Sequence, residues 1–332
     1  MLRENNFNID RPYGGRAASI TLGSLPNSII AWWEKSIYCR KIRNTKVDPP
    51  LFILGIWRSG TTLLHNLLAQ DDRLDFPNNY QVAYPHTFLS TEKPNARWIG
   101  AFLPKKRPQD NMTIGMDEPQ EDEFALGALI GRSCPMAWAF PRQAQLYDRY
   151  LTLRTLSEKE LAEWKAALTG YVQKLAFKYR RPLVLKSPGH TGRIKVLLEL
   201  FPNAKFVHIY RNPYVVFQSI MHTMQAVAPW VALQQSNHKN LEDRTINQYK
   251  EVYGAFFEER GLIPKGHLHD LCFEELEKNP IGQIRNLYQS LDLPDFEYVE
   301  SKLLQYTESL SGYKKNRFPE ISEELWRRIA QE

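Results

Sequence analysis

Residues 51–64 carry the clearest chemical signal in this chain, because an apolar run is followed by a polar loop rich in hydrogen-bond donors. Gly55 and Gly60 have the G-x-x-x-x-G spacing of a phosphate-binding loop, in which backbone N–H groups converge on an anion. A helix starting near Thr61 would add the positive end of its dipole. Thr61 replaces the lysine of nucleotide triphosphatases, and Arg58 supplies a cation from inside the loop. We therefore expect a site for a phosphate-like group, built differently from a site for ATP with magnesium.

Two later segments also end an apolar run with a cationic residue. Residues 205–219 have the pattern of strand, polar turn and helix, with Arg211 where the strand ends. Ser219 lies eight residues after Arg211, about two turns into the expected helix. In the segment RPLVLKSPGH, a short apolar strand ends in Lys186. Taken singly, Arg211 and Lys186 are each equally consistent with an ordinary solvent-exposed residue at the end of a strand.

Together the three segments resemble the sulfotransferases that use 3′-phosphoadenosine 5′-phosphosulfate (PAPS), and the similarity covers about residues 49–320. The resemblance implies that Arg211 and Ser219 hold the 3′-phosphate of the donor, and that Lys186 reaches the sulfuryl group or the bridging oxygen. It also implies that the first loop binds the 5′-phosphosulfate through Arg58, Ser59, Gly60, Thr61 and Thr62. The product would be PAP, and no metal would be required.

Two further segments resemble this family less closely. Phe273 stands where the family usually has a tyrosine, and it is equally consistent with stacking on adenine and with an ordinary place in the core. The sequence GYKKNRF near the C-terminus resembles the basic loop that closes over the 3′-phosphate, although such loops are often just solvated surface. The cations concerned are Lys314, Lys315 and Arg317.

Apolar strands are expected at residues 51–55, 183–186, 205–210 and 267–273, alternating with helical stretches. This pattern predicts a single α/β domain with a P-loop-like parallel sheet flanked by helices on both faces. Ligands of such sheets bind beyond the carboxyl ends of the strands, where the suspected site residues lie. We divide the chain into an N-terminal helical extension, residues 1–48, and a sulfotransferase domain, residues 49–332.

Composition narrows the partners and the compartment. The net charge of +6 suits a multiply charged anionic donor, and no Lys/Arg-rich run or RNA-binding signature favours nucleic acid. Three scattered cysteines provide neither a disulfide framework nor zinc spacing, which indicates a reducing cytoplasm. No signal peptide and no apolar stretch of about 18 residues is visible. The sequence therefore predicts a soluble, cytoplasmic, bacterial-type enzyme.

Two regions are expected to shape the acceptor pocket. The first is a helix expected between residues 25 and 43, in which apolar residues at helical spacing, Ile29, Trp32, Trp33 and Ile37, precede a cationic end. Three roles are open for this helix: it covers the acceptor site, it lies on a membrane surface, or it packs on the core of the domain. Residues 92–119, rich in proline and charge, predict a long surface excursion of the kind that forms lids. Aromatic residues that could line an apolar pocket, which would favour a sterol, lipid or phenol, are Trp57, Tyr80, Tyr84, Phe88, Trp138 and Phe140.

A general base must take the proton that the acceptor hydroxyl loses. Cytosolic members of the family have a histidine two residues after the lysine of the third motif, but Pro188 stands at that position here. The nearest histidine, His190, is our first choice. Glu121 or Glu123 is the second, from a P-x-E-D-E-x-A-L stretch that resembles bacterial sulfotransferases. Acidic residues in a first helical turn also have a purely structural explanation.

We therefore predict transfer of a sulfuryl group from PAPS to a hydroxyl of a small, hydrophobic acceptor. Two alternatives stay open. A P-loop kinase-like enzyme would bind ATP with magnesium. A non-catalytic protein would bind nucleotide, or a membrane surface through Trp32 and Trp33, without transferring any group.

Overall fold

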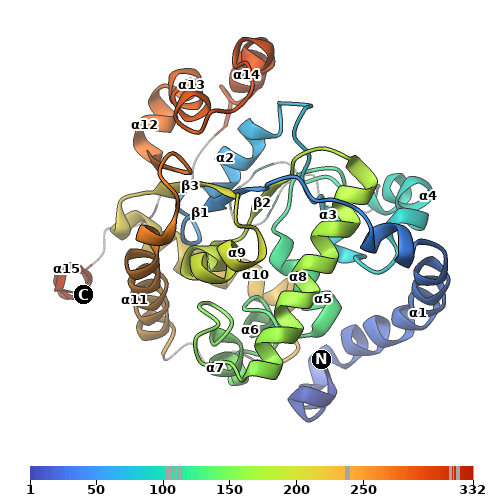
Figure 1. Ribbon diagram of the computed structural model, residues 1–332. Coiled ribbons are helices and arrows are strands. Elements are labelled where there is room, and N and C mark those ends of the chain that lie inside the picture. Colours follow the sequence, from blue (N-terminus) through green and yellow to red (C-terminus); the bar gives the residue numbers. More distant parts are fainter. Residues whose placement is uncertain are drawn as a thin grey trace.

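The computed structural model contains one four-stranded parallel sheet with the strand order β2-β1-β3-β4 (Figure 1). It describes residues 1–101, 107, 110, 112, 114–235, 240–313, 316, 318 and 322–331. The strands are β1 (Leu51–Leu54), β2 (Val184–Lys186), β3 (Lys205–Tyr210) and β4 (Leu268–Cys272). Each strand lies within one or two residues of its predicted position, so the parallel sheet is confirmed.

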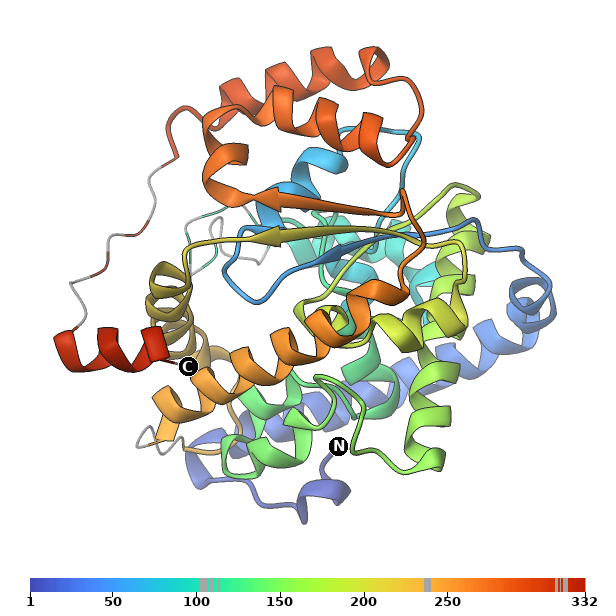
Figure 2. The same ribbon diagram turned by 60° about the vertical axis from the view of Figure 1, so that its left-hand side comes forward.

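Helices cover both faces of this sheet, as Figure 2 shows. Side chains alternate along β1, so that Phe52 and Leu54 join one hydrophobic core while Leu51 and Ile53 join another. The first core lies against α5 (Asp122–Ile130) and α8 (Glu158–Tyr179), and the second lies against α2 (Thr61–Leu68), α13 (Pro280–Ser290) and α14 (Glu297–Ser309). The predicted fold class, an α/β domain with a P-loop-like sheet, is confirmed.

The remaining helices connect the strands and close the ends of the domain. They are α1 (Gly14–Arg43), α3 (Asn79–Ala83), α4 (Phe88–Gly100), α6 (Met136–Ala139), α7 (Ala144–Asp148), α9 (Ile194–Leu200), α10 (Pro213–Val231), α11 (Leu241–Glu259), α12 (Phe273–Lys278) and α15 (Glu323–Gln331). Short 3₁₀ turns include Pro188–Gly192 between β2 and α9. None of the helices in the described part of the chain combines the length and apolarity needed to cross a bilayer.

Helix α1 begins well before the segment expected to be helical and packs on the domain through one side. The buried carboxylate of Glu34 forms an ion pair with Lys174 of α8 and accepts hydrogen bonds from Ser90 of α4. Tyr38 packs against Phe177, with the ring centroids 5.8 Å apart. These contacts with α8 and α4 attach α1 to the rest of the domain.

The expected surface excursion of residues 92–119 is more ordered at its start than predicted. Residues 92–100 continue α4, and the carboxylate of Glu92 accepts hydrogen bonds from Asn78 and Gln81. Pro94 lies inside this helix, in its second turn. Among the described residues of this stretch, those that line the central cavity described below all lie between Arg107 and Pro119.

Candidate active site

The loop after β1 has the conformation that its glycines predict. Gly55 has φ +142°, donates to Thr191 Oγ1 at 2.7 Å, and would bring an added Cβ to 2.5 Å from the carbonyl oxygen of Ile209. The loop leads directly into α2. Thr61 and Thr62 lie in the first turn of this helix, where backbone N–H groups have no carbonyl partner within the helix. This end of the sheet is therefore suited to an anion.

Ser59 takes a different role from the one predicted. Its hydroxyl donates to the carbonyl of Ile56 at 2.7 Å and the residue is fully buried, away from the cavity. The side chain shapes the loop, and the contact of Ser59 with the donor stays a prediction.

Phe273, Gly60 and Arg211 form one packed group beside this loop. Gly60 has φ +102°, and a Cβ there would lie 2.2 Å from Cδ2 of Phe273. The guanidinium carbon of Arg211 lies 4.2 Å from the centroid of the Phe273 ring, and Nη1 donates to the carbonyl oxygen of Arg58 at 3.2 Å. Burial lowers the pKa of Arg211. A cation and an aromatic face thus lie together at the cavity wall.

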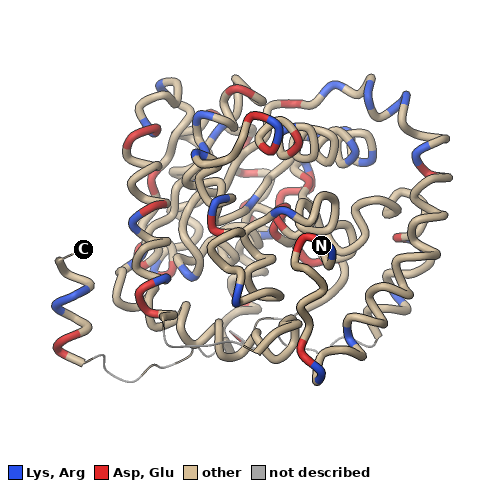
Figure 3. Tube along the Cα trace, turned by 90° about the horizontal axis from the view of Figure 1, so that it is seen from below, with Lys and Arg blue, Asp and Glu red and all other residues tan. Residues whose placement is uncertain are grey.

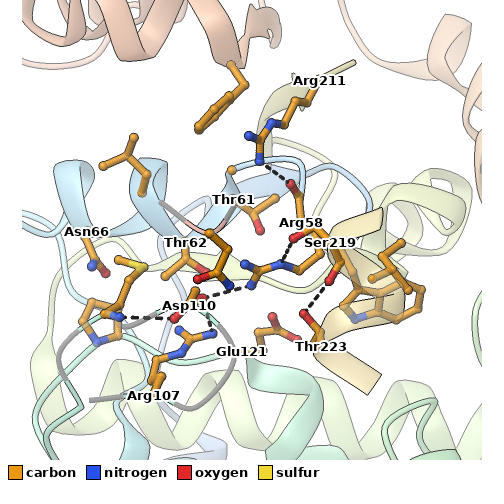
Figure 4. A pocket seen from close by; sticks show the side chains of 18 of the residues that line it. Arg58, Thr61, Thr62, Asn66, Arg107, Asp110, Glu121, Arg211, Ser219 and Thr223 are labelled. Atoms are coloured by element: carbon orange, nitrogen blue, oxygen red, sulfur yellow. Dashed lines mark hydrogen bonds and ion pairs between the residues drawn. The ribbon is translucent and has the colours of Figure 1, made fainter. Parts of the chain in front are cut away.

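Arg58 joins the first two motifs directly (Figure 4). Its backbone has φ +70°, and its side chain donates from Nε to Ser219 Oγ at 2.9 Å and from Nη1 to Asp110 Oδ2 at 2.9 Å. Arg107 also forms an ion pair with Asp110, at 3.3 Å. The buried carboxylate of Asp110 occupies a place that two guanidinium groups make favourable for an anion.

A cavity of about 500 Å³ lies at these strand ends and includes most of the predicted donor residues. Its lining includes Arg58, Gly60, Thr61, Thr62, Arg211, Ser219 and Phe273. The opposite part of the lining is largely apolar, with Trp57, Phe124, Trp138, Ile220 and Met224. Lys314, Lys315 and Arg317 lie outside the described residues, although their neighbours Tyr313, Asn316 and Phe318 line the cavity.

Three consecutive acidic residues at the start of α5 each contact a basic side chain from the end of β2 or from the segment that follows it. Glu121, the N-cap, accepts from Lys186 Nζ at 2.8 Å. Asp122 lies 2.7 Å from His190 Nε2, and Glu123 accepts from Arg193 Nη1 at 2.5 Å. The sequence explanation by helix dipole alone is therefore incomplete, because ion pairs hold these carboxylates in place.

Of this acidic stretch, only Glu121 reaches the cavity. Glu123 and His190 are fully buried, and neither lies in the lining. His190 packs edge-on against Phe52, with the ring centroids 5.3 Å apart. Neither side chain is exposed to an acceptor hydroxyl in the cavity, so in this conformation Glu121 is the candidate base that lies at the cavity.

Lys186 lies behind Glu121 and does not itself line the cavity. Its side chain is 3% exposed, against 15% for Glu121. Burial lowers the pKa of Lys186, and the Glu121 charge and hydrogen bond oppose that effect. In this structure Lys186 acts on the cavity through Glu121, which differs from the direct contact that the resemblance implies.

Two of the six aromatic residues expected on the acceptor side line the cavity, and four do not. Trp57 and Trp138 line the cavity, whereas Tyr80, Phe88 and Phe140 are buried core residues and Tyr84 packs against the core. A second hollow of about 390 Å³ adjoins the first and shares Asn79, Ile114, Gln120 and Phe124 with it. Its other lining residues, all apolar, are Val82, Ala83, Met116 and Ala128.

The N-terminal helix does not cover this chamber. Among the described residues, those that line either hollow all come from positions beyond 48. In this conformation residues 1–48 therefore contribute no described residue to the cavity that is expected to bind the acceptor. The described residues also include no cluster of three or more histidine, cysteine or acidic side chains placed to hold a metal.

Sequence reasoning missed several polar residues of the cavity. Asp110 and Arg107 carried no motif, and Tyr313 donates from its hydroxyl to the carbonyl of Asp110 at 2.7 Å. Arg244 and Gln248 of α11 also line the cavity, and both donate to Asp148. For Arg244 and Gln248 the sequence offers one weak signal, which is their i, i+4 spacing on an amphipathic helix.

Comparisons with known proteins agree with this geometry. A family model described as "Sulfotransferase family" matches residues 49–298. The omega-hydroxy-beta-dihydromenaquinone-9 sulfotransferases Stf3 of Mycobacterium bovis and Mycobacterium tuberculosis are each 39% identical over 320 residues, covering 96% of this chain and 82% of theirs.

Solved structures share the fold. Sulfotransferase STF9 of Mycobacterium avium superposes with a TM-score of 0.71 at 18% identity, covering 91% of this chain and 80% of that one. STF1 of Mycobacterium tuberculosis gives 0.66 at 17% identity, covering 91% and 81%. The family match over most of the chain and the close curated relatives lead to one conclusion: this chain belongs to the sulfotransferase family.

Proposed function

We propose that this sulfotransferase uses PAPS as donor and sulfates the hydroxyl group of a lipid acceptor, with Glu121 as the general base. The observation that carries the proposal is the position of Glu121. Its carboxylate lines the cavity together with the cationic group around Arg58 and the apolar group around Phe124 and Trp138. Sulfation of a hydroxyl on an apolar acceptor requires a base that lies between the anion site for the donor and an apolar pocket for the acceptor.

The donor end has the right chemistry for a nucleotide with two anionic ends. Arg58 and the first turn of α2 offer donors to the phosphosulfate, and Arg211 with Ser219 offers a second cationic position. Asp110 acts as a stand-in anion, because its carboxylate already binds both Arg58 and Arg107. The Phe273 ring beside Arg211 provides an aromatic face for a purine.

PAPS supplies an activated sulfuryl group whose bond to the phosphate oxygen breaks as the acceptor oxygen bonds to sulfur, leaving PAP. Glu121 takes the proton that the acceptor hydroxyl loses. Arg58 and the N–H groups of Thr61 and Thr62 stabilise the negative charge that develops on the departing phosphate. Lys186 orients Glu121, and positioning of this kind supplies a large part of the rate enhancement in such transfers.

The apolar hollow supports a lipid rather than a small phenol as acceptor. The hollow lined by Val82, Met116 and Ala128 continues from the chamber and is large enough for several methylene groups. The relatives at 39% identity act, according to their name, on an omega-hydroxylated menaquinone. We infer that this chain places a terminal or ring hydroxyl near Glu121 and the hydrocarbon part in the hollow.

The first test is thermal stabilisation by PAP compared with ATP plus magnesium. A ligand that binds only the folded state raises its stability by RT ln(1 + [L]/Kd). We expect a clear rise in Tm with PAP that Arg211→Ala removes, and transfer of sulfate from labelled PAPS to a hydroxylated isoprenoid quinol. Stabilisation by ATP with magnesium alone would favour the kinase-like alternative. PAP binding without transfer to any hydroxylated lipid would favour the non-catalytic one.

A further inference from the structure

Helix α1 presents a continuous apolar stripe to solvent. The stripe consists of Leu22, Leu25, Ile29, Trp32 and Trp33. The first four follow one another at spacings of three or four along one side of the helix, and Trp33 lies four residues after Ile29 on the same side. Four of these side chains are between 61% and 74% exposed, and Trp33 is 49% exposed. A contiguous exposed apolar surface of this kind marks an interaction site.

The other side of α1 is fixed to the domain, so the stripe cannot turn inward. Glu34 is 1% exposed and pairs with Lys174, and Thr87 donates to Asn27 at 2.9 Å. Ala17 belongs to a small core with Phe140 and Tyr147. The side of α1 that includes Ala17 and Glu34 is therefore covered by the domain, whereas the opposite side, which bears the apolar stripe, is exposed.

The charge distribution along α1 identifies the kind of partner. Between residues 14 and 34 the helix contains only Arg16 and Glu34 as charged residues, whereas residues 35–43 contain four cations and no acid. Figure 3 shows α1 at the right of the molecule, with blue positions towards one end and tan along most of its length. Exposed Ile37 lies four residues after Trp33, and exposed Arg40 and Arg43 then follow at spacings of three.

We propose that the outer stripe of α1 docks this enzyme on the surface of an anionic phospholipid membrane. Tryptophan prefers the interface between hydrocarbon and headgroups, and aliphatic residues beside it enter the acyl boundary. Arg40 and Arg43 then meet the phosphate groups of anionic lipids. This proposal stands on the helix surface alone and is independent of the acceptor, although a membrane is where a lipid acceptor would be met.

The test is flotation of the purified full chain with liposomes. Vesicles of phosphatidylcholine alone are compared with an equimolar mixture of phosphatidylcholine and phosphatidylglycerol. We expect binding to the mixed vesicles, weakened by salt, and a drop in affinity on the order of tenfold or more in the double variant Ile29→Ser/Trp32→Ser. Phe257→Ser/Leu262→Ser, at two exposed apolar positions on and just after α11, is the matched control and should bind like the wild type.

Two further measurements separate this role from other uses of the stripe. Arg40→Glu/Arg43→Glu should lose binding to the mixed vesicles while keeping its PAP-induced rise in Tm, since the donor site lies elsewhere. Trp32→Phe/Trp33→Phe should still bind, with reduced quenching of tryptophan fluorescence by brominated lipid. The proposal is overturned if the stripe variant binds vesicles like the wild type. It is also overturned if the wild type ignores vesicles and sediments as a dimer that the stripe variant converts to monomers.

Discussion

Lys186 Nζ donates a hydrogen bond to Glu121 Oε1 at 2.8 Å. Lys186 is almost completely buried, whereas Glu121 lies at the cavity wall. The two residues come from different elements, the end of β2 and the N-cap of α5. The contact fixes the direction of the carboxylate, because a buried ammonium has few other acceptors. Of the two side chains, Glu121 lines the cavity and Lys186 does not, which agrees with the proposed positioning role of the lysine.

Replacement of Glu121 by glutamine should lower kcat by about 100-fold or more, because it removes the proton acceptor. PAP binding should stay within about twofold, since Glu121 contributes no positive charge to the donor end. The measurements are initial rates with a lipid acceptor and PAP titrations by calorimetry. Glu118→Gln, at another carboxylate of the same cavity lining, is the control and should keep most of the activity. Equal losses in both variants would count against Glu121 as the base.

His190→Asn should weaken the fold more than the reaction. The change leaves the Asp122 carboxylate buried without its partner, which costs about 3–5 kcal/mol in comparable buried pairs. Urea unfolding should show this loss, and kcat measured where the variant is folded should fall far less than in Glu121→Gln. An unchanged Tm with activity abolished would restore His190 to a direct role.

The stability effect of His190 should also depend on pH. Burial by itself raises the pKa of Asp122, but the charge and hydrogen bond of His190 outweigh it and hold that pKa below its ordinary value of 3.8. The resulting stabilisation is complete above the unfolded pKa and is lost as pH falls through the folded one. The free-energy gap between wild type and His190→Asn should therefore narrow below about pH 4. A gap that widens on acidification would contradict this pairing.

The sequence predicted the sheet, and it predicted most of the cationic and loop residues that lie around the cavity, because those signals are local. Gly55, Gly60 and Arg211 follow apolar runs, and strand ends of a parallel sheet necessarily meet at one edge. The sequence could not show that His190 is buried away from the cavity, because proximity in sequence to Lys186 says nothing about which side of the 3₁₀ turn faces the cavity. Asp110 could not be found either, since its contact with Arg58 spans 52 residues without any motif.

Gly60→Ala should damage the donor site specifically. The new Cβ would lie 2.2 Å from the Phe273 ring at a backbone φ of +102°, so Phe273 and with it Arg211 must shift. We expect PAP affinity to fall by about tenfold or more. Gly254→Ala in α11, where nothing lies within 4 Å of the added Cβ, should leave PAP affinity unchanged and stabilise the helix by about 0.5–1 kcal/mol. Thermal shift with and without PAP measures both effects.

Asp110→Asn should strengthen PAP binding. The Asp110 carboxylate neutralises Arg58 and Arg107, and an anionic ligand must compete with it for the same donors. Removing that charge should lower the Kd for PAP several-fold, by about 1 kcal/mol, with a steeper dependence on salt. Calorimetric titrations at two salt concentrations provide the measurement. Weaker binding in the variant would mean that Asp110 serves to hold the arginines in place for the ligand.

Filling the second hollow should separate long acceptors from short ones. Ala128 lies on the exposed side of α5 and lines this hollow, so Ala128→Trp adds bulk there without disturbing the core. If the hydrocarbon part of the acceptor lies in the hollow, KM for a long-chain hydroxylated quinol should rise by about tenfold. A short-chain analogue should be sulfated at the wild-type rate by the same variant, because its hydroxyl still reaches Glu121. Equal effects on both acceptors would place the chain elsewhere in the cavity, along the side formed by Trp138 and Met224.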